Sequence, residues 1–308
     1  MQLVNLNLSH SKSKIYKVVD ENFLENSFIV YNKVFGEVLY NPYCAGISLQ
    51  NKMQKVGIEF SKLIKKLCFK DSVDKKTIIE LVFLSGGLFY NLNYGFKKNF
   101  NFSLPQCFLG IARYHIPNTL GDYQAKIDYT NFEALLDNAN ILIGDTLATG
   151  ATLSTGIEYL INYAQKENKS INSIVFVTLA GSKKGAIAFK NILKKYGLEK
   201  KSSIIFANQV FHLMENGTDL RFFGPDAIVS PEAEKETLKR YGENLGYNFK
   251  CAVFDWGTRC KNPLKHYVEF KKEVEKLLSA TKSEHDKKIL TKLIQKADKE
   301  AKAYLGKL

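Results

Sequence analysis

The sequence has few cysteines, and none is arranged as a metal ligand or a redox pair. Its 308 residues contain five, Cys44, Cys68, Cys107, Cys251 and Cys260. An odd number without a CxxC pair argues against a disulfide framework and against a zinc knuckle. We therefore expect the chain to work in a reducing compartment, the cytoplasm.

Long hydrophobic runs and the common nucleotide-binding fingerprints are also missing. No window approaches the about 18 uninterrupted apolar residues of a membrane-spanning helix. The first residues, MQLVNLNLSHSKSKIYK, lack the apolar centre of a signal peptide. We expect no membrane partner. The sequence has no GxxxxGKS or GxxxxGKT loop, and no GxGxxG follows an apolar run, so neither a Walker loop nor a dinucleotide-binding turn is predicted.

Basic residues outnumber acidic ones. Lys and Arg total 44 against 31 Asp and Glu, which gives a formal net charge of +13. Such a surface favours acidic ligands such as phosphates, nucleotides or nucleic acid. The lysines are spread along the chain rather than clustered, so a bias in genome composition explains the charge equally well. Hydrophobic residues make up 45% of the chain, which is ample for a folded core.

Short apolar runs alternate with amphipathic stretches along the middle of the chain. We predict strands at about 78–84, 107–114, 141–145, 173–181 and 202–208. We predict helices at about 51–67, 153–166 and 183–196. This alternation indicates an α/β fold with a doubly wound, mostly parallel sheet. The polar stretch IPNTLGDYQAKIDY, residues 116–129, is predicted to be a mobile functional loop.

The chain divides into three parts on this interpretation. Residues 1–65 form an N-terminal arm and a covering helix, residues 66–260 the core with an insertion at about 208–248, and residues 261–308 a basic helical tail. The core thus carries helical N-terminal and C-terminal additions. The tail has apolar residues at helical spacing that need burial, so we expect it to pack on the domain or on a second subunit rather than bind nucleic acid.

The stretch ILIGDTLATGATLSTG, residues 141–156, joins a predicted strand to a predicted helix through a loop rich in glycine and threonine. Free backbone N–H groups and the helix dipole both favour an anion at such a point. Thr149 and Thr152 would add hydroxyl donors, and Gly150 would let the backbone approach the ligand. Asp145 would meet sugar hydroxyls or a metal-bound group. The stretch predicts a phosphate site.

Within it, DTLATGAT resembles the phosphoribosyl pyrophosphate loop of the type I phosphoribosyltransferases. Three more stretches, in the same order, are similar to segments of the uracil phosphoribosyltransferases. VFLSGGL (82–88) is similar to the pyrophosphate loop, GIARYHIP (110–117) to the segment that opens the flexible loop, and FDWGTR (254–259) to the turn that faces the base. The resemblance covers about residues 80–259.

The resemblance implies transfer of a phosphoribosyl group from phosphoribosyl pyrophosphate to a base, a pyrimidine such as uracil, with magnesium (Mg2+) and release of pyrophosphate. It assigns catalytic roles to Asp145, Arg113 and Asp255. Contacts to phosphoribosyl pyrophosphate fall to Asp145, Ala148, Thr149, Gly150, Ala151, Thr152, Ser85, Gly86 and Gly87. Contacts to the base fall to Phe254, Asp255, Trp256 and Gly257. Relatives of this kind are commonly homodimers.

Two positions depart from the family pattern. Gly144 replaces the first of two acidic residues, and Ser85 stands where uracil-specific relatives have an arginine. The loss of that cation would slow the reaction by a few powers of ten unless Lys97, Lys98 or Lys126 replaced it. A second function therefore stays open: a catalytically weakened nucleotide-binding regulator, or an anti-phage defence effector, acting through a protein or RNA partner.

The histidines carry little signal in the sequence. His115 and His212 are interpreted as ordinary polar residues rather than as acid or base groups.

Overall fold

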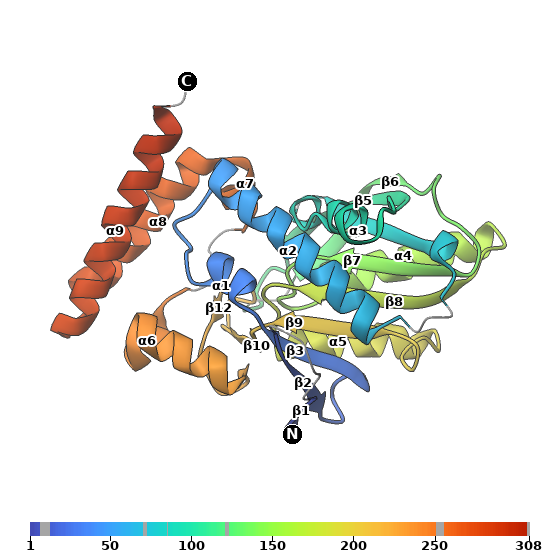
Figure 1. Ribbon diagram of the computed structural model, residues 1–308, viewed down its shortest axis with the longest axis horizontal. Helices are drawn as coiled ribbons and strands as arrows, with labels where there is room; N and C mark the ends of the chain where they lie inside the picture. The colour runs from blue at the N-terminus through green and yellow to red at the C-terminus, as the bar shows by residue number, and fades with distance from the viewer. Residues whose placement is uncertain (7–12, 70–72, 85, 121–122, 251–255, 307–308) are drawn as a thin grey trace.

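The structure is a computed structural model that describes residues 1–6, 13–69, 73–84, 86–120, 123–250 and 256–306 (Figure 1). Within these ranges nine strands form one sheet in the order β1-β2-β3-β9-β8-β7-β4-β5-β6. Its six central strands run parallel. They are β3 (Asn26–Tyr31), β9 (Ser203–Ala207), β8 (Ile171–Thr178), β7 (Ala139–Gly144), β4 (Ile78–Leu84) and β5 (Gln106–His115). The predicted α/β fold class is confirmed.

Antiparallel strands complete both edges of the sheet. β1 (Gln2–Asn5) and β2 (Lys14–Val19) extend it beyond β3, and β6 (Tyr123–Asn131) pairs with β5. The N-terminal addition therefore contributes strands as well as helices. The predicted loop at 116–129 is wrong for its second half, because residues 123–129 belong to β6. Alternate side chains of β6 are more and less exposed, which is the pattern of an edge strand.

Helices cover both faces of the sheet (Figure 1). α1 (Lys33–Leu39), α2 (Gly46–Leu67) and α3 (Leu92–Phe100) pack on one face, and α4 (Ala151–Lys166) and α5 (Lys183–Lys195) on the other. Side chains of the central strand β8 point alternately to the two faces of the sheet. Val175 and Val177 pack in the core with α1, α2 and α3, whereas Ile174 and Phe176 pack in the core with α4 and α5. A strand buried on both faces needs no polar alternation. Short 3-10 turns, η1 (Lys75–Thr77) and η2 (Gly87–Phe89), flank β4.

The predicted insertion holds two small antiparallel pairs and a helix. β10 (Gln209–Val210) pairs with β13 (Ile228–Val229), and β11 (His212–Leu213) pairs with β12 (Leu220–Arg221). They are followed by α6 (Pro231–Asn248). The predicted turn FDWGTR is wrong for its last four residues, since Trp256 to Arg259 lie on α7 (Trp256–Lys261). Phe254 and Asp255 lie outside the described residues.

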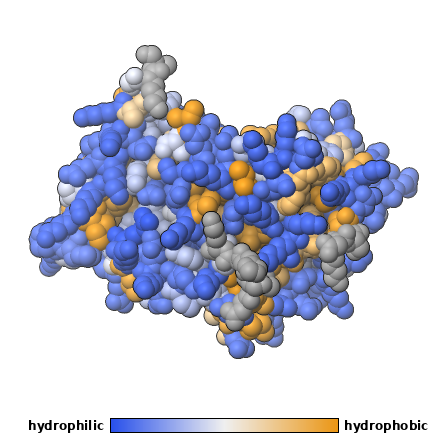
Figure 2. Space-filling model, in the orientation of Figure 1, coloured by the Kyte–Doolittle hydropathy of each residue, from blue (hydrophilic) through white to orange (hydrophobic). Residues whose placement is uncertain are grey.

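The C-terminal tail forms a helical hairpin of α8 (Pro263–Ala280) and α9 (Glu284–Leu305) beside α6 (Figure 1). Its buried side chains Phe270, Val274, Leu290 and Leu293 belong to the same core cluster as Tyr241 of α6. The tail thus packs on this chain. Hydrophilic side chains cover most of the face in Figure 2, with hydrophobic ones in small separate groups. None of the helices in the described ranges has the length and apolar character to cross a membrane.

Candidate functional site

The strand order places a crevice at the carboxyl ends of β4 and β7. β4 leads to β5 on one side of the sheet, whereas β7 leads to β8 and β9 on the other. In open doubly wound sheets ligands bind where the order of the strands reverses in this way. The loop that follows Gly144 lies at this position, so topology and sequence point to the same place.

The loop between β7 and α4 is held by the neighbouring strand and its loop. The Asp145 N–H donates to the Val177 carbonyl at 3.2 Å, and the Leu147 N–H donates to the Ala180 carbonyl at 3.0 Å. The Ser182 N–H donates in turn to the Leu147 carbonyl at 2.8 Å. These hydrogen bonds fix the backbone of the loop between β7 and α4, which favours a preorganised binding site.

The first turn of α4 presents backbone donors to the same loop. Gly150 is the N-cap residue with φ of 83°, and no side chain in the described structure caps the helix. Oγ1 of Thr149 accepts only a long hydrogen bond of 3.5 Å from the Ala151 N–H. A 16-residue helix that begins in this way offers unused N–H groups and its positive end to an anion.

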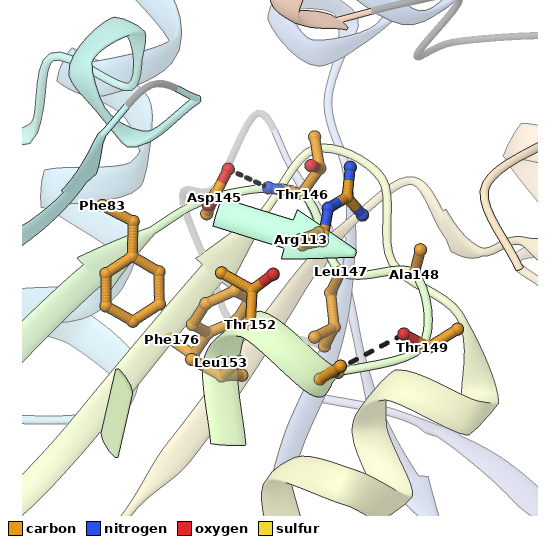
Figure 3. Close-up of a pocket in the computed structure, with 12 residues that line it drawn as sticks. Phe83, Arg113, Asp145, Thr146, Leu147, Ala148, Thr149, Thr152, Leu153 and Phe176 are labelled. Atoms are coloured by element: carbon orange, nitrogen blue, oxygen red, sulfur yellow. Dashed lines mark hydrogen bonds between the residues drawn. The ribbon is translucent and has the colours of Figure 1, made fainter. Parts of the chain in front are cut away.

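A hollow opens over this loop (Figure 3). Its cavity volume of about 40 Å³ exceeds what one water molecule needs. It brings together seven predicted site residues, Arg113, Asp145, Ala148, Thr149, Gly150, Ala151 and Thr152. Five other residues that line it are not predicted from the sequence, Phe83, Thr146, Leu147, Leu153 and Phe176. The phenylalanines come from β4 and β8, so only the folded sheet reveals them.

Asp145 is the one carboxylate among the described residues that line the hollow. Burial raises its pKa to about 7, although a hydrogen bond from the Thr146 N–H at 2.7 Å and the charge of Arg113 both oppose the shift. Near neutral pH the carboxyl group therefore populates both protonation states. It can accept hydrogen bonds from sugar hydroxyls, or donate one.

The β5–β6 hairpin supplies the cation of the site. Figure 3 shows the Arg113 guanidinium beside the loop that runs from Asp145 to Ala148. This group also lies over the ring of Tyr123, 5.6 Å from its centroid. Such a cation–π contact restricts a side chain that is otherwise exposed. The Tyr123 hydroxyl in turn donates to the Asn216 carbonyl of the β11–β12 hairpin at 3.5 Å.

The structure explains the missing acidic residue at 144. A Cβ atom at Gly144 would lie 2.7 Å from Cβ of Tyr90 and 2.8 Å from its ring. Tyr90 is fully buried, and its hydroxyl accepts a hydrogen bond from the Leu179 N–H at 3.0 Å. The ring of Tyr90 thus takes the space that a side chain at 144 would need, and glycine is the residue that fits.

Of the residues predicted to contact pyrophosphate, Gly86 and Gly87 do not line the hollow. Gly87 is buried, and a Cβ there would lie 3.1 Å from the Gly144 carbonyl oxygen. Gly86 is partly buried and is not among the lining residues. Ser85 lies outside the described residues, as do Phe254 and Asp255. Trp256 and Gly257 belong to α7, and nothing is described of their side chains.

No protein-family model and no curated protein matches the chain. Solved structures to which it is similar include three phosphoribosyltransferases. A hypoxanthine phosphoribosyltransferase from Staphylococcus aureus is 18% identical over 52% of this chain and 76% of that one, with a TM-score of 0.32. An orotate phosphoribosyltransferase from Francisella tularensis is 11% identical over 72% and 76%, with a TM-score of 0.34. An adenine phosphoribosyltransferase from Leishmania donovani is 12% identical over 68% and 96%, with a TM-score of 0.37.

Proposed function

We propose that this protein is a phosphoribosyltransferase that transfers a phosphoribosyl group from phosphoribosyl pyrophosphate to a base and releases pyrophosphate. One observation carries the proposal. A partly buried carboxylate, an uncapped helix N-terminus and an arginine meet in one hollow at the switch point of a doubly wound sheet. These groups suit a ligand that combines sugar hydroxyls with phosphates.

Each part of the hollow has a role in this reaction. The N–H groups of the first turn of α4, with the hydroxyls of Thr149 and Thr152, would hold the 5′-phosphate. Asp145 would contact the ribose hydroxyls, and Arg113 would face the leaving pyrophosphate. The protein would then accelerate the reaction by positioning the reactants and by stabilising the charge that develops on the leaving group.

The residues present fit magnesium (Mg2+) only as an ion shared with the substrate. In the described part of the chain no three His, Cys, Asp or Glu side chains are grouped to hold a metal. Mg2+ in such sites is commonly bound through one or two carboxylates plus substrate phosphates, and Asp145 would be the one carboxylate here. When bound, the ion would neutralise charge on the pyrophosphate.

We propose a pyrimidine such as uracil as the acceptor, because the four sequence stretches follow the order found in uracil phosphoribosyltransferases. The three-part division of the chain, a cytoplasmic location and a homodimer belong to the same proposal. The uracil assignment rests on the sequence alone, so the acceptor has to be tested with a panel of bases.

The test is release of pyrophosphate by purified protein with phosphoribosyl pyrophosphate, Mg2+ and each of uracil, orotate, hypoxanthine, guanine and adenine. The variant Thr152→Val keeps the side-chain shape and removes one hydroxyl from the phosphate site. We expect it to weaken phosphoribosyl pyrophosphate binding by about 10- to 100-fold, the loss of one hydrogen bond to a charged group. Thr291→Val, exposed on α9, is the matched control and should behave as the wild type.

Absence of release with every base would contradict the proposal. Calorimetric titration of the same protein with phosphoribosyl pyrophosphate and with nucleoside monophosphates then separates the alternative function. Binding without turnover would favour a nucleotide-binding regulator or defence effector, and salt-sensitive RNA binding would add a nucleic-acid partner.

A further inference from the structure

A histidine–aspartate pair lies on the insertion, outside the hollow described above. Nδ1 of His212, on β11, is hydrogen-bonded to Oδ1 of Asp226. Both side chains are partly open to solvent, with 22% and 32% of their surface exposed. Nε2 of His212 makes no hydrogen bond to any residue that the structure describes. A carboxylate on one ring nitrogen fixes the tautomer and leaves the other nitrogen as a proton acceptor.

The imidazole of His212 packs directly against the backbone of Gly224, where no side chain would fit. Gly224 has φ of 159°, and a Cβ there would lie 2.1 Å from Cγ of His212. The partner of His212 across the β11–β12 pair is Arg221, whose guanidinium donates to the Tyr247 carbonyl on α6 at 3.2 Å. The arginine is therefore engaged with α6, and the imidazole has the carboxylate of Asp226 as its partner.

The backbone places the pair beside the loop at 145–150, called here the phosphate loop. The loops after β7, β8 and β9 run side by side: Leu147 is bridged to Gly181, and Ser182 is bridged to Phe211, the residue before His212. Two strand spacings of about 4.8 Å give a backbone separation of about 10 Å between the phosphate loop and β11. The Ser182 hydroxyl also donates to the Ala148 carbonyl, at 2.5 Å. A nucleotide-sized ligand bound at the loop would span this distance.

A second contact ties the same hairpin to the mouth of the hollow. Asn216, in the turn between β11 and β12, accepts a hydrogen bond from the Tyr123 hydroxyl. The ring of the same tyrosine makes the cation–π contact with Arg113. The hairpins β5–β6 and β11–β12 thus meet, although 93 residues separate Tyr123 from Asn216. Arg113 and His212 therefore stand on two hairpins that touch each other beside the loop at 145–150.

Among the described residues that line the hollow, none other than Asp145 is a carboxylate or a histidine that could accept this proton. The place of Asp145 at the tip of β7 assigns it to the ribose. We propose that His212, positioned by Asp226, is the general base that accepts the proton of the acceptor nitrogen. This inference rests on the proposed function. As that nitrogen bonds to C1 of the ribose, the C1–O bond breaks and its electron pair leaves on pyrophosphate. The N–H proton passes to Nε2 of His212.

The first test compares variants in pyrophosphate release. His212→Asn keeps an N–H that can bond to Asp226 but removes the acceptor Nε2, and it should lower kcat by about 10²-fold or more with little change in KM. Asp226→Asn should lower kcat by about 10-fold, as expected for a group that orients the imidazole. His285→Asn, exposed on α9, is the matched control and should keep wild-type rates.

A comparison of two acceptors shows whether His212 acts as a general base or has only a structural role. The ring N–H of 5-fluorouracil is more acidic than that of uracil, so it needs less help to ionise. The loss of kcat in His212→Asn should therefore be at least several-fold smaller with 5-fluorouracil. An equal loss with both acceptors, or no loss at all, would overturn the inference while leaving phosphoribosyl transfer intact.

A second measurement needs no turnover. Diethyl pyrocarbonate modifies accessible imidazole nitrogens, and mass spectrometry locates the product. We expect modification of His212 to slow at least fivefold when phosphoribosyl pyrophosphate and uracil, or uridine monophosphate, saturate the protein, with His285 unchanged. Unchanged labelling of His212 in the presence of bound nucleotide would overturn the inference. If the wild type releases no pyrophosphate with any base, the proposed function fails and this inference fails with it.

Discussion

At the scale of single residues, Asp145 carries two opposing demands. The proposed contact with sugar hydroxyls requires a carboxylate, but the position of Asp145 at the end of a buried strand removes part of the water around it. Burial therefore raises its pKa to about 7. With glycine at 144, held there by the ring of Tyr90, no second carboxylate shares the position. The cost of ionising this side chain is thus part of the folded protein's stability.

We predict that Asp145→Asn stabilises the protein more as the pH rises. The folded-state pKa lies above the about 3.9 of an unfolded aspartate, so the folded wild type binds more protons between these values. Its stability falls as the pH rises through this window and levels off above about 7, whereas asparagine does not titrate. Urea unfolding at pH 5, 6, 7 and 8 should show the difference growing to pH 7 and then becoming constant.

Asp137→Asn is the control for this series. Hydrogen bonds from the Ser170 side chain and backbone lower the pKa of this exposed carboxyl group. The variant should therefore be less stable than the wild type, and by a constant amount from pH 5 to 8, because both pKa values of Asp137 lie below that range. If the difference in free energy of unfolding between Asp145→Asn and the wild type does not change with pH, the pKa of the Asp145 carboxyl group is not raised.

At the scale of elements, the sequence predicts what depends on local pattern. β4, β5, β7, β8 and β9 each contain a short apolar run, and the loop at 145–150 is recognisable from its composition and its place between strand and helix. β6 is missing from the prediction because none of its side chains is fully buried, so this edge strand has no apolar run in the sequence. Tyr90, Phe83 and Phe176 approach the site only through tertiary packing, so no local signal reveals them.

The packing of α4 against α5 gives an element-scale prediction at Gly150. A Cβ at this residue would lie 2.5 Å from Cβ of Ala188 on α5, and its φ is 83°. We expect Gly150→Ala to cost about 2–4 kcal/mol, the sum of overpacking and left-handed strain. Adding Ala188→Gly should recover the packing part only. A double-mutant cycle by urea unfolding measures this coupling.

Gly197→Ala provides the comparison. Gly197 has φ of 69° and nothing within 4 Å of an added Cβ, so its substitution brings backbone strain without a clash. We expect about 1–2 kcal/mol there. Additive effects of Gly150→Ala and Ala188→Gly would show that the two helices do not restrict the loop at this point.

At the scale of the whole molecule, the two ends of the chain share one core. Arg259 of α7 is fully buried, and its guanidinium donates to three backbone carbonyls near the end of α1 and in the connection to α2. The acceptors are Cys44 at 2.6 Å, Asn41 at 2.8 Å and Val38 at 3.2 Å. Burial lowers the pKa of Arg259. More than 200 residues separate this arginine from its acceptors in the sequence.

We predict that Arg259→Met destabilises the protein by about 3–5 kcal/mol, because it leaves buried carbonyls without donors. Arg259→Lys should also lose stability, since an ammonium group cannot reproduce the planar set of N–H donors. Arg240→Met is the control: Arg240 pairs with Glu236 on the surface of α6, and we expect a loss below about 1 kcal/mol.

Trp256, the single tryptophan, lies on α7 and reports on this region by fluorescence. Far-UV circular dichroism reports on the helices and strands of the whole chain. Both signals should move to lower urea concentration together, because one core unfolds as one unit. A fluorescence transition that separates from the circular dichroism transition would show instead that the C-terminal helices unfold independently of the sheet.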